Sequence, residues 1–205
     1  MTPMSTASKP APGLRERKKI RTRQAIRRAA YRLFEERGFD ATRVDEIAEA
    51  AEVSPSTVFR YFPTKEDIVL SDEEDPVIEA ALRARPADEP PLTALRAALH
   101  DVMTELWRQP EAVTELRQRM RLVASVPAIR ARMHESVGKS GDVLHGAIAE
   151  RTGRAPGDLE IRVFTGAMLG ALTEALLHWT EEGLEDDLLD VLDRSFRVLE
   201  NGLAD

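Results

Sequence analysis

Apolar residues recur at intervals of three and four along almost the whole chain of 205 residues. This spacing is typical of amphipathic α-helices, and no segment shows the strict alternation of apolar and polar residues that indicates a β-strand. Proline and glycine interrupt the pattern repeatedly, and both residues commonly mark helix boundaries. The sequence therefore predicts an all-α protein of about nine helices.

The first helical segment runs from Leu14 to Gly38, where glycine is expected to end it. Residues 1–13 are rich in Pro, Ser, Thr and Ala and have no periodicity, so we expect a disordered leader there. Four arginines are interleaved with the apolar positions of this segment and are expected on its solvent side: Arg23, Arg27, Arg28 and Arg32.

Two much shorter helical segments follow. Thr42 and Asp45 have the spacing of a capping box, which predicts the start of the first segment. Ser54 is the expected N-cap of the second segment, and Pro55 fits its first position, where no backbone N–H is needed.

A second capping box, Thr64 with Asp67, opens a fourth helix that either breaks or kinks near Pro76. Longer helices are expected beyond a loop at 87–91. Their predicted ranges are 92–108, 110–124, 127–151, 158–181 and 185–201.

Charge divides the chain into two unlike parts. Residues 1–65 hold 14 Lys and Arg against 8 Asp and Glu, a net charge of +6, whereas residues 66–205 carry −13. This asymmetry points to a polyanion partner, such as nucleic acid, for the first part alone. A solvated basic helix gives the same charge, so both interpretations stand at this point.

Several classes of protein lack their signatures here. The chain has no cysteine, and no apolar run approaches the roughly 18 residues of a membrane span. HExxH, the P-loop, GxGxxG and the Glu-x-x-His pairs of di-iron bundles are absent. We therefore expect a cytoplasmic protein that is not an enzyme, has no metal or cofactor, and does not associate with membranes.

The two short helices have the layout of a helix-turn-helix, in which the second helix enters the major groove of DNA. Ala48 is the small residue expected where the helices touch, and residues 52–54 form the turn. Val53 and Val58 are expected to hold the pair together.

The run S-P-S-T-V-F-R-Y-F-P-T-K-E-D, part of the segment from Gly38 to Val69, resembles the N-terminal DNA-binding domain of the TetR/AcrR family of bacterial regulators. The resemblance covers roughly residues 14–70. It implies a helix-turn-helix DNA-binding domain at 14–70 and a helical ligand-binding and dimerisation domain at 71–205. It further implies a homodimeric repressor on a pseudo-palindromic operator, associated with the nucleoid when bound and released by a small-molecule inducer.

Nine residues become candidates for DNA contact through this resemblance: Thr42, Arg43, Pro55, Ser56, Thr57, Arg60, Tyr61, Thr64 and Lys65. Pro55, Ser56, Thr57 and Arg60 would face the bases. The other positions would lie at phosphates, namely Thr42, Arg43, Tyr61 and Lys65. Thr64 begins the fourth predicted helix, and the free backbone N–H groups at a helix start suit a phosphate. Tyr61 as a core aromatic and Lys65 as a merely solvated residue are the alternatives.

Two positions depart from the family pattern. Glu52 stands in the turn where glycine is usual, so a left-handed backbone there is expected to cost about 1 kcal/mol. Phe59 stands where tyrosine is frequent and removes a hydroxyl that often contacts phosphate.

Apolar and small residues occupy more than one side of segment 158–181, and segment 185–201 carries a broad apolar stripe. These surfaces predict a four-helix interface between two subunits, although burial within one subunit explains the same pattern. Seven large or adaptable apolar residues are candidates for an inducer pocket, with ordinary core positions as the alternative: Met103, Trp107, Met120, Met133, Phe164, Met168 and Trp179.

The chemistry of the inducer has two opposed indications. The acidic domain surface favours a cationic or neutral ligand, whereas the arginines between 117 and 132 favour an anion. A DNA binder without any ligand is a further alternative, and it predicts an interior without a continuous cavity.

Overall fold

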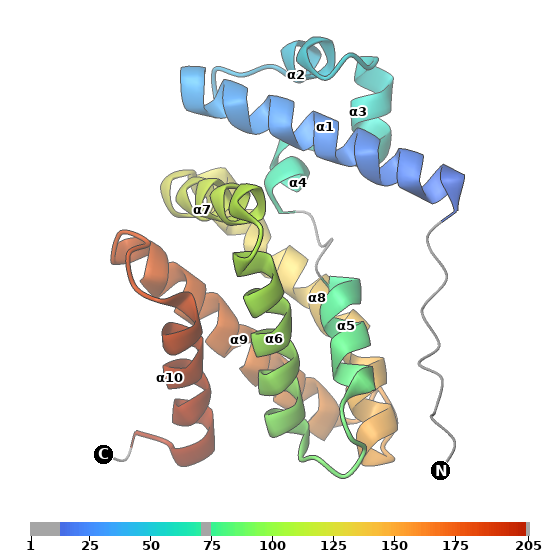
Figure 1. Cartoon of the computed structure of the whole chain (residues 1–205), viewed down its shortest axis with the longest axis vertical. Helices are drawn as coiled ribbons and strands as arrows, with labels where there is room; N and C mark the ends of the chain where they lie inside the picture. Colours follow the sequence, from blue (N-terminus) through green and yellow to red (C-terminus); the bar gives the residue numbers. More distant parts are fainter. Residues whose placement is uncertain (1–12, 71–74, 204–205) are drawn as a thin grey trace. The chain divides into compact units, whose positions relative to one another are not determined.

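The computed structural model describes residues 13–70 and 75–203, so the predicted leader lies outside it apart from Gly13. All regular structure in these residues is α-helical, as predicted (Figure 1). The ten helices are α1 (Leu14–Arg37), α2 (Val44–Ala50), α3 (Pro55–Tyr61), α4 (Lys65–Val69), α5 (Asp75–Ala84), α6 (Pro91–Trp107), α7 (Pro110–Ser125), α8 (Pro127–Thr152), α9 (Leu159–Glu181) and α10 (Leu188–Asn201). The described residues contain one helix more than the nine predicted, because the predicted fourth helix breaks into α4 and α5 rather than kinking.

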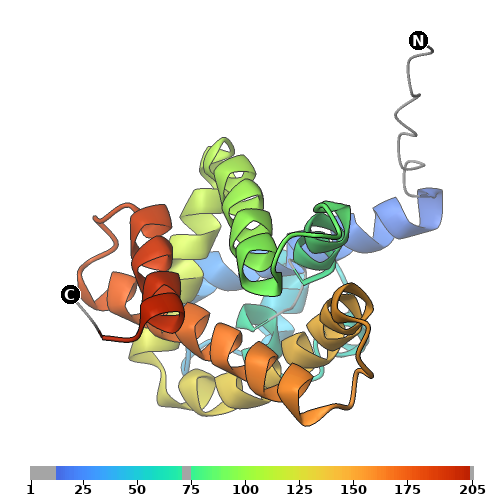
Figure 2. The same ribbon diagram turned by 90° about the horizontal axis from the view of Figure 1, so that it is seen from below.

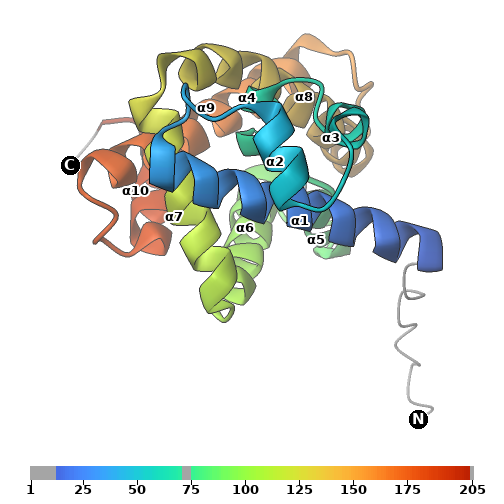
Figure 3. The same cartoon turned by 90° about the horizontal axis from the view of Figure 1, so that it is seen from above.

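The chain forms two compact units, and the boundary between Ile68 and Val69 falls within α4. In the first unit, α2 packs against both α1 and α3 (Figure 3). Phe34, Ile47, Val58 and Phe62 are buried in it. These apolar contacts are the main force that holds such short helices together, because helices of seven residues are not stable alone.

Arg27 departs from the predicted basic solvent face of the first helix. It is only 5% exposed and shares the buried side of α1 with Ile26 and Ala30. Helical periodicity alone does not separate the two sides clearly here, because arginines occupy positions on both of them.

The turn between α2 and α3 forms as predicted, with an unusual backbone at Glu52. This residue has φ 55°, in the left-handed region that favours glycine. The Val53 amide donates to the Ala48 carbonyl at 2.9 Å, and Ala48 is buried. The Ser54 hydroxyl accepts from the Thr57 amide, which starts α3 with Pro55 at its first position.

The predicted capping box of the second helix is wrong by one residue. Arg43 is the N-cap of α2, and its amide donates to the Glu46 carboxylate at 2.9 Å. Thr42 is instead buried, and its hydroxyl donates to the carbonyls of Leu33 and Gly38. The carbonyl of Gly38, the C-cap of α1, lies beyond the last intrahelical donor, and Thr42 supplies a donor to it.

The second unit consists of α5 to α10 around one apolar core. The helix pair α9 and α10 packs side by side, and α9 also packs against α7 and α8 (Figure 2). Arg96 of α6 donates to Asp193 of α10 at 2.8 Å, and this hydrogen bond holds the pKa of the Asp193 carboxyl below its usual value. The predicted helix boundaries in this unit differ from the observed ones by at most three residues.

Glu52→Gly is expected to stabilise the helix-turn-helix by about 1 kcal/mol, because glycine adopts a positive φ without strain. Hydrogen exchange of the α2 and α3 amides in the full chain should slow about fivefold. Glu52→Ala removes the same charge but keeps a Cβ, so it is the control and should not slow exchange. Equal protection in both variants would show that the left-handed backbone is not the cause.

Candidate DNA-binding surface and ligand cavity

Helix α3 presents three kinds of surface. Val58 points inward and is 1% exposed, whereas Ser56 and Arg60 lie on the opposite side and are exposed. Pro55 and Phe59, one turn apart, form an exposed apolar flank. Thr57 and Tyr61 form the other flank and are half-buried.

The hydroxyl groups at the start of α3 are tied to one another. Ser54 Oγ lies 2.9 Å from both Ser56 Oγ and Thr57 Oγ1. It also accepts from the Thr57 amide at 3.2 Å. The two predicted base-facing hydroxyls are therefore held in place by the N-cap, which fixes their positions and occupies part of their hydrogen-bonding capacity.

The predicted cationic residues differ in their surroundings. Arg60 is exposed, and its guanidinium carbon lies 5.3 Å from the centroid of the Tyr61 ring, a cation–π distance. Arg43 is exposed and forms an ion pair with Asp45 at 3.2 Å. The backbone hydrogen bond from Arg43, together with nearby Arg37, holds the pKa of the Glu46 carboxyl below its usual value.

Lys65 has an intramolecular role that the sequence did not predict. Its ammonium donates to the Phe39 carbonyl at 2.5 Å and to the Thr42 carbonyl at 3.1 Å. The same nitrogen lies 4.2 Å from the centroid of the Phe39 ring. Lys65 therefore ties the start of α4 to the loop between α1 and α2, so its charge serves the fold whether or not a phosphate also approaches it.

The predicted capping box of α4 is present. The Thr64 amide donates to the Asp67 carboxylate at 2.9 Å, and the Asp67 amide donates to the Thr64 hydroxyl at 3.3 Å. The burial of Thr42 removes its hydroxyl from the set that can reach a phosphate. The remaining predicted DNA contacts are exposed or half-buried.

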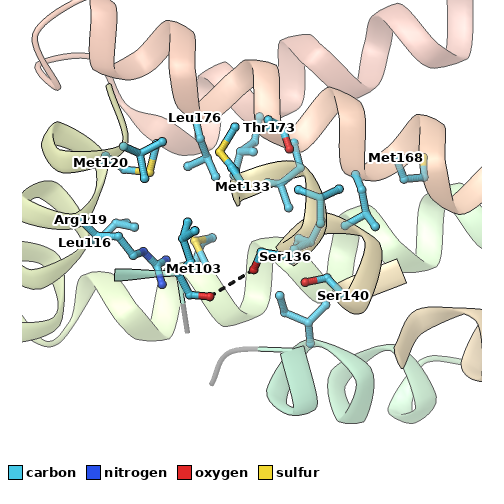
Figure 4. Close-up of a pocket in the computed structure, with 18 of the residues that line it drawn as sticks. Met103, Leu116, Arg119, Met120, Met133, Ser136, Ser140, Met168, Thr173 and Leu176 are labelled. Carbon is cyan, nitrogen blue, oxygen red and sulfur yellow. Dashed lines mark hydrogen bonds between the residues drawn. The ribbon is translucent and has the colours of Figure 1, made fainter. Parts of the chain in front are cut away.

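The second unit contains a cavity of ≈ 200 Å³ whose walls are mostly leucine, valine and methionine (Figure 4). Four residues with polar side chains interrupt this apolar lining: Arg119, Ser136, Ser140 and Thr173. The cavity is thus suited to an apolar ligand with a small number of hydrogen-bonding or charged groups.

Four of the seven predicted pocket residues line the cavity, namely Met103, Met120, Met133 and Met168. Trp107, Phe164 and Trp179 are not among its lining residues. Trp179 is fully buried, its indole N–H donates to the Asp186 carbonyl at 2.8 Å, and its ring lies 6.1 Å from that of Trp107. Phe164 packs against the core. The alternative of ordinary core positions therefore holds for these three residues.

Sequence reasoning missed one contact at the cavity wall. Ser136 of α8 donates from its hydroxyl to the Leu70 carbonyl at 3.1 Å, and both residues line the cavity (Figure 4). Leu70 directly follows α4, so the cavity wall includes the first residues of the second unit, Val69 and Leu70. No pattern in the sequence singles out this pair, because 66 positions separate its members.

Neither of two other kinds of site is found in residues 13–70 and 75–203. None of their helices is long and apolar enough to cross a membrane. These residues also contain no group of three or more His, Cys, Asp or Glu arranged to hold a metal ion.

A three-helix unit with a helix-turn-helix, joined to an all-helical unit with an apolar cavity, defines a DNA-binding regulator of the helix-turn-helix class. Residues 26–71 match the family described as bacterial regulatory proteins, tetR family, and residues 89–204 match the MftR C-terminal domain. The second match spans more than half of the chain. The chain therefore belongs to the TetR family of DNA-binding transcription regulators.

Two relatives illustrate the match. TcmR of Streptomyces glaucescens is 43% identical over 104 residues, which are 50% of this chain and 46% of TcmR. The transcriptional regulator MftR of Mycobacterium tuberculosis is 28% identical over 196 residues, 91% of this chain and 93% of MftR. The chain thus spans about half of the first relative and nearly all of the second.

A solved structure shares the fold. The transcriptional regulator FadR from Bacillus subtilis, in complex with stearoyl-CoA, aligns with a TM-score of 0.57 at 20% identity. The alignment covers 88% of this chain and 99% of FadR. At this identity the likeness concerns the arrangement of the helices alone.

Lys65→Met is expected to lower the free energy of unfolding by about 1–3 kcal/mol, because two carbonyls lose a charged donor while an unbranched side chain one atom shorter is kept. Urea denaturation followed by circular dichroism measures this change. Lys18→Met, at an exposed position on α1, is the matched control and should leave stability unchanged. Unchanged stability in Lys65→Met, with a loss of DNA affinity alone, would favour the phosphate clamp instead.

Proposed function

We propose that the chain is a repressor that binds a pseudo-palindromic operator as a homodimer and leaves it when a small molecule fills the cavity of the second unit. The observation that carries this proposal is the Ser136–Leu70 hydrogen bond, because it joins the cavity wall to the segment directly after α4. Ligand binding can thereby change the strain on the connection to the DNA-binding unit.

The DNA contact is assigned to α3 and its surroundings. Arg60, exposed at the centre of the outward side, is the best placed residue to donate to a base edge or a phosphate. Ser56, Thr57 and Pro55 lie at the start of the same helix, with Tyr61 one turn further on. Arg43 and Lys65 add positive charge near the other helix starts.

Homodimerisation is assigned to α9 and α10. Leu159 and Val163 of α9 are 72% and 60% exposed, an unusual placement for large apolar residues. One and two turns further on the same side lie Gly166 and Gly170, where a Cβ would meet no atom within 4 Å. Such a side permits close approach of a second helix, and Val198 of α10 adds a further exposed apolar side chain.

The inducer is assigned an apolar body with a polar or anionic group. The cavity walls are apolar, and Arg119 is the arginine among its lining residues. Four methionines make the walls adaptable in shape. Stearoyl-CoA, which FadR from Bacillus subtilis holds, combines an apolar chain with anionic groups and is therefore a suitable first probe.

Two other functions receive less support. Enzymatic activity lacks a motif in the sequence, and the TetR family consists of transcription regulators. A DNA binder without a ligand predicts an interior without a continuous cavity, and the cavity in the second unit counts against it.

Purified protein is expected to protect a site in the DNA that flanks its own gene, with two half-sites centred about 34–36 Å apart. Arg60→Ala should weaken binding about tenfold through the loss of one charged contact. Arg154→Ala, an exposed arginine of the second unit, is the control and should bind like the unaltered chain. Failure to protect any site at low salt, where electrostatic attraction is strongest, would contradict the proposal.

Ser136→Ala is expected to weaken operator binding of the ligand-free protein about two- to tenfold, because one hydrogen bond that holds Leu70 is lost. If stearoyl-CoA is an inducer, its effect on operator affinity should shrink by the same factor. Ser140→Ala is the matched control, since Ser140 lines the same cavity one turn further along α8. Operator affinity titrated with and without the probe measures both effects, and an unchanged ligand-free affinity in Ser136→Ala would refute the coupling.

A further inference from the structure

Phe59 is an exposed aromatic residue at the centre of the helix-turn-helix. Its side chain is 50% exposed, whereas its neighbour Val58 on the same helix is 1% exposed. Among the described residues of α2 and α3, it is the large apolar side chain that faces solvent. Single exposed apolar residues are common on protein surfaces, so the position of this one decides its meaning.

The position of Phe59 on α3 places it beside the predicted base-facing side. Successive residues of an α-helix are about 100° apart, so Phe59 stands next to Arg60 around the helix and one turn from Pro55. Phe59 and Pro55 therefore make an apolar strip beside the outward side of Ser56 and Arg60. A helix that enters the major groove with that side forward brings this strip to the base edges.

The polar side chains at the start of α3 have limited capacity to read bases, so an apolar contact can add to recognition. The Ser56 and Thr57 hydroxyls both lie 2.9 Å from Ser54 Oγ, so part of their hydrogen-bonding capacity is used within the helix start. Fewer hydrogen bonds are then available for reading bases from these two positions. An apolar contact adds sequence information without a donor or an acceptor.

The C5-methyl group of thymine is the apolar feature of the major groove. The Phe59 ring has no hydroxyl and donates no hydrogen bond to a phosphate, so a contact with a base edge is the interaction that its chemistry favours. We propose that Phe59, supported by Pro55, is a specificity-determining residue that packs on the methyl group of one thymine in each operator half-site. This inference rests on the proposed function, since it takes α3 as the helix that enters the groove.

The test removes the methyl group and nothing else. An operator is first selected from random duplexes with the full-length protein, and each thymine is then replaced singly by uracil. Uracil keeps every hydrogen-bonding group of thymine, so only the apolar contact changes. One position per half-site should lose about fourfold in affinity, the effect of one methyl group in an apolar contact.

The protein variants assign that methyl group to Phe59. In Phe59→Ala the same thymine-to-uracil change should have no effect, whereas Phe59→Tyr, which keeps the ring, should retain the fourfold difference. Val77→Ala is the control, because Val77 is exposed to a similar extent but belongs to the second unit. Thermal unfolding of Phe59→Ala checks that the variant is folded, as expected for a half-exposed side chain.

The outcomes separate this inference from the function on which it rests. If uracil is tolerated at every position, or if it costs Phe59→Ala as much as the unaltered chain, the thymine contact is refuted while operator binding stands. If no duplex is selected at all, the proposed function fails first. A methyl effect that disappears only in Phe59→Ala supports the contact.

Discussion

The carbonyl groups at the end of α1 and in the loop after it are the constraint on which the DNA-binding unit depends. A helix leaves the carbonyls of its last turn without intrahelical donors, and carbonyls in a loop also need partners where they are buried. Thr42 supplies its hydroxyl to Leu33 and Gly38, and Lys65 supplies its ammonium to Phe39 and Thr42. These bonds join the start of α4 to the end of α1. Because α2 and α3 lie between these points in the chain, their placement against α1 depends on the same contacts.

Most of the fold was predictable because its signals are local. The Ser54 cap with Pro55 and the Thr64–Asp67 capping box each involve residues no more than three positions apart, and both are present. The role of Thr42 is not predictable from local spacing. Its partner Leu33 lies nine positions away, and the competing cap at Arg43 uses a backbone amide that no side-chain pattern reveals. Local spacing predicts helices well, but it does not rank two possible uses of one hydroxyl.

The candidate site was less predictable because its shape arises from packing between distant helices. Residue type selected four methionines that line the cavity, since adaptable side chains suit such walls. The same criterion selected Trp179, which the core buries completely and whose indole N–H finds a carbonyl partner. Size and polarity are shared by core and pocket residues, so only the three-dimensional structure separates them. On α3, by contrast, the helical period alone separates inward Val58 from outward Arg60.

Helix α4 lies on the covalent route between the two proposed activities, and the proposed coupling depends on its short length. Five residues cannot form a stable helix alone, so α4 depends on its capping box and on the burial of Ile68 and Val69. At its start Lys65 is fixed to the loop after α1, and directly after its end Leu70 is fixed to Ser136 of the cavity wall. A long helix that is stable by itself would keep its position after the loss of either hydrogen bond. In the proposed coupling, a helix of five residues transmits a displacement, because Leu70 lies only about one turn and a half from Lys65.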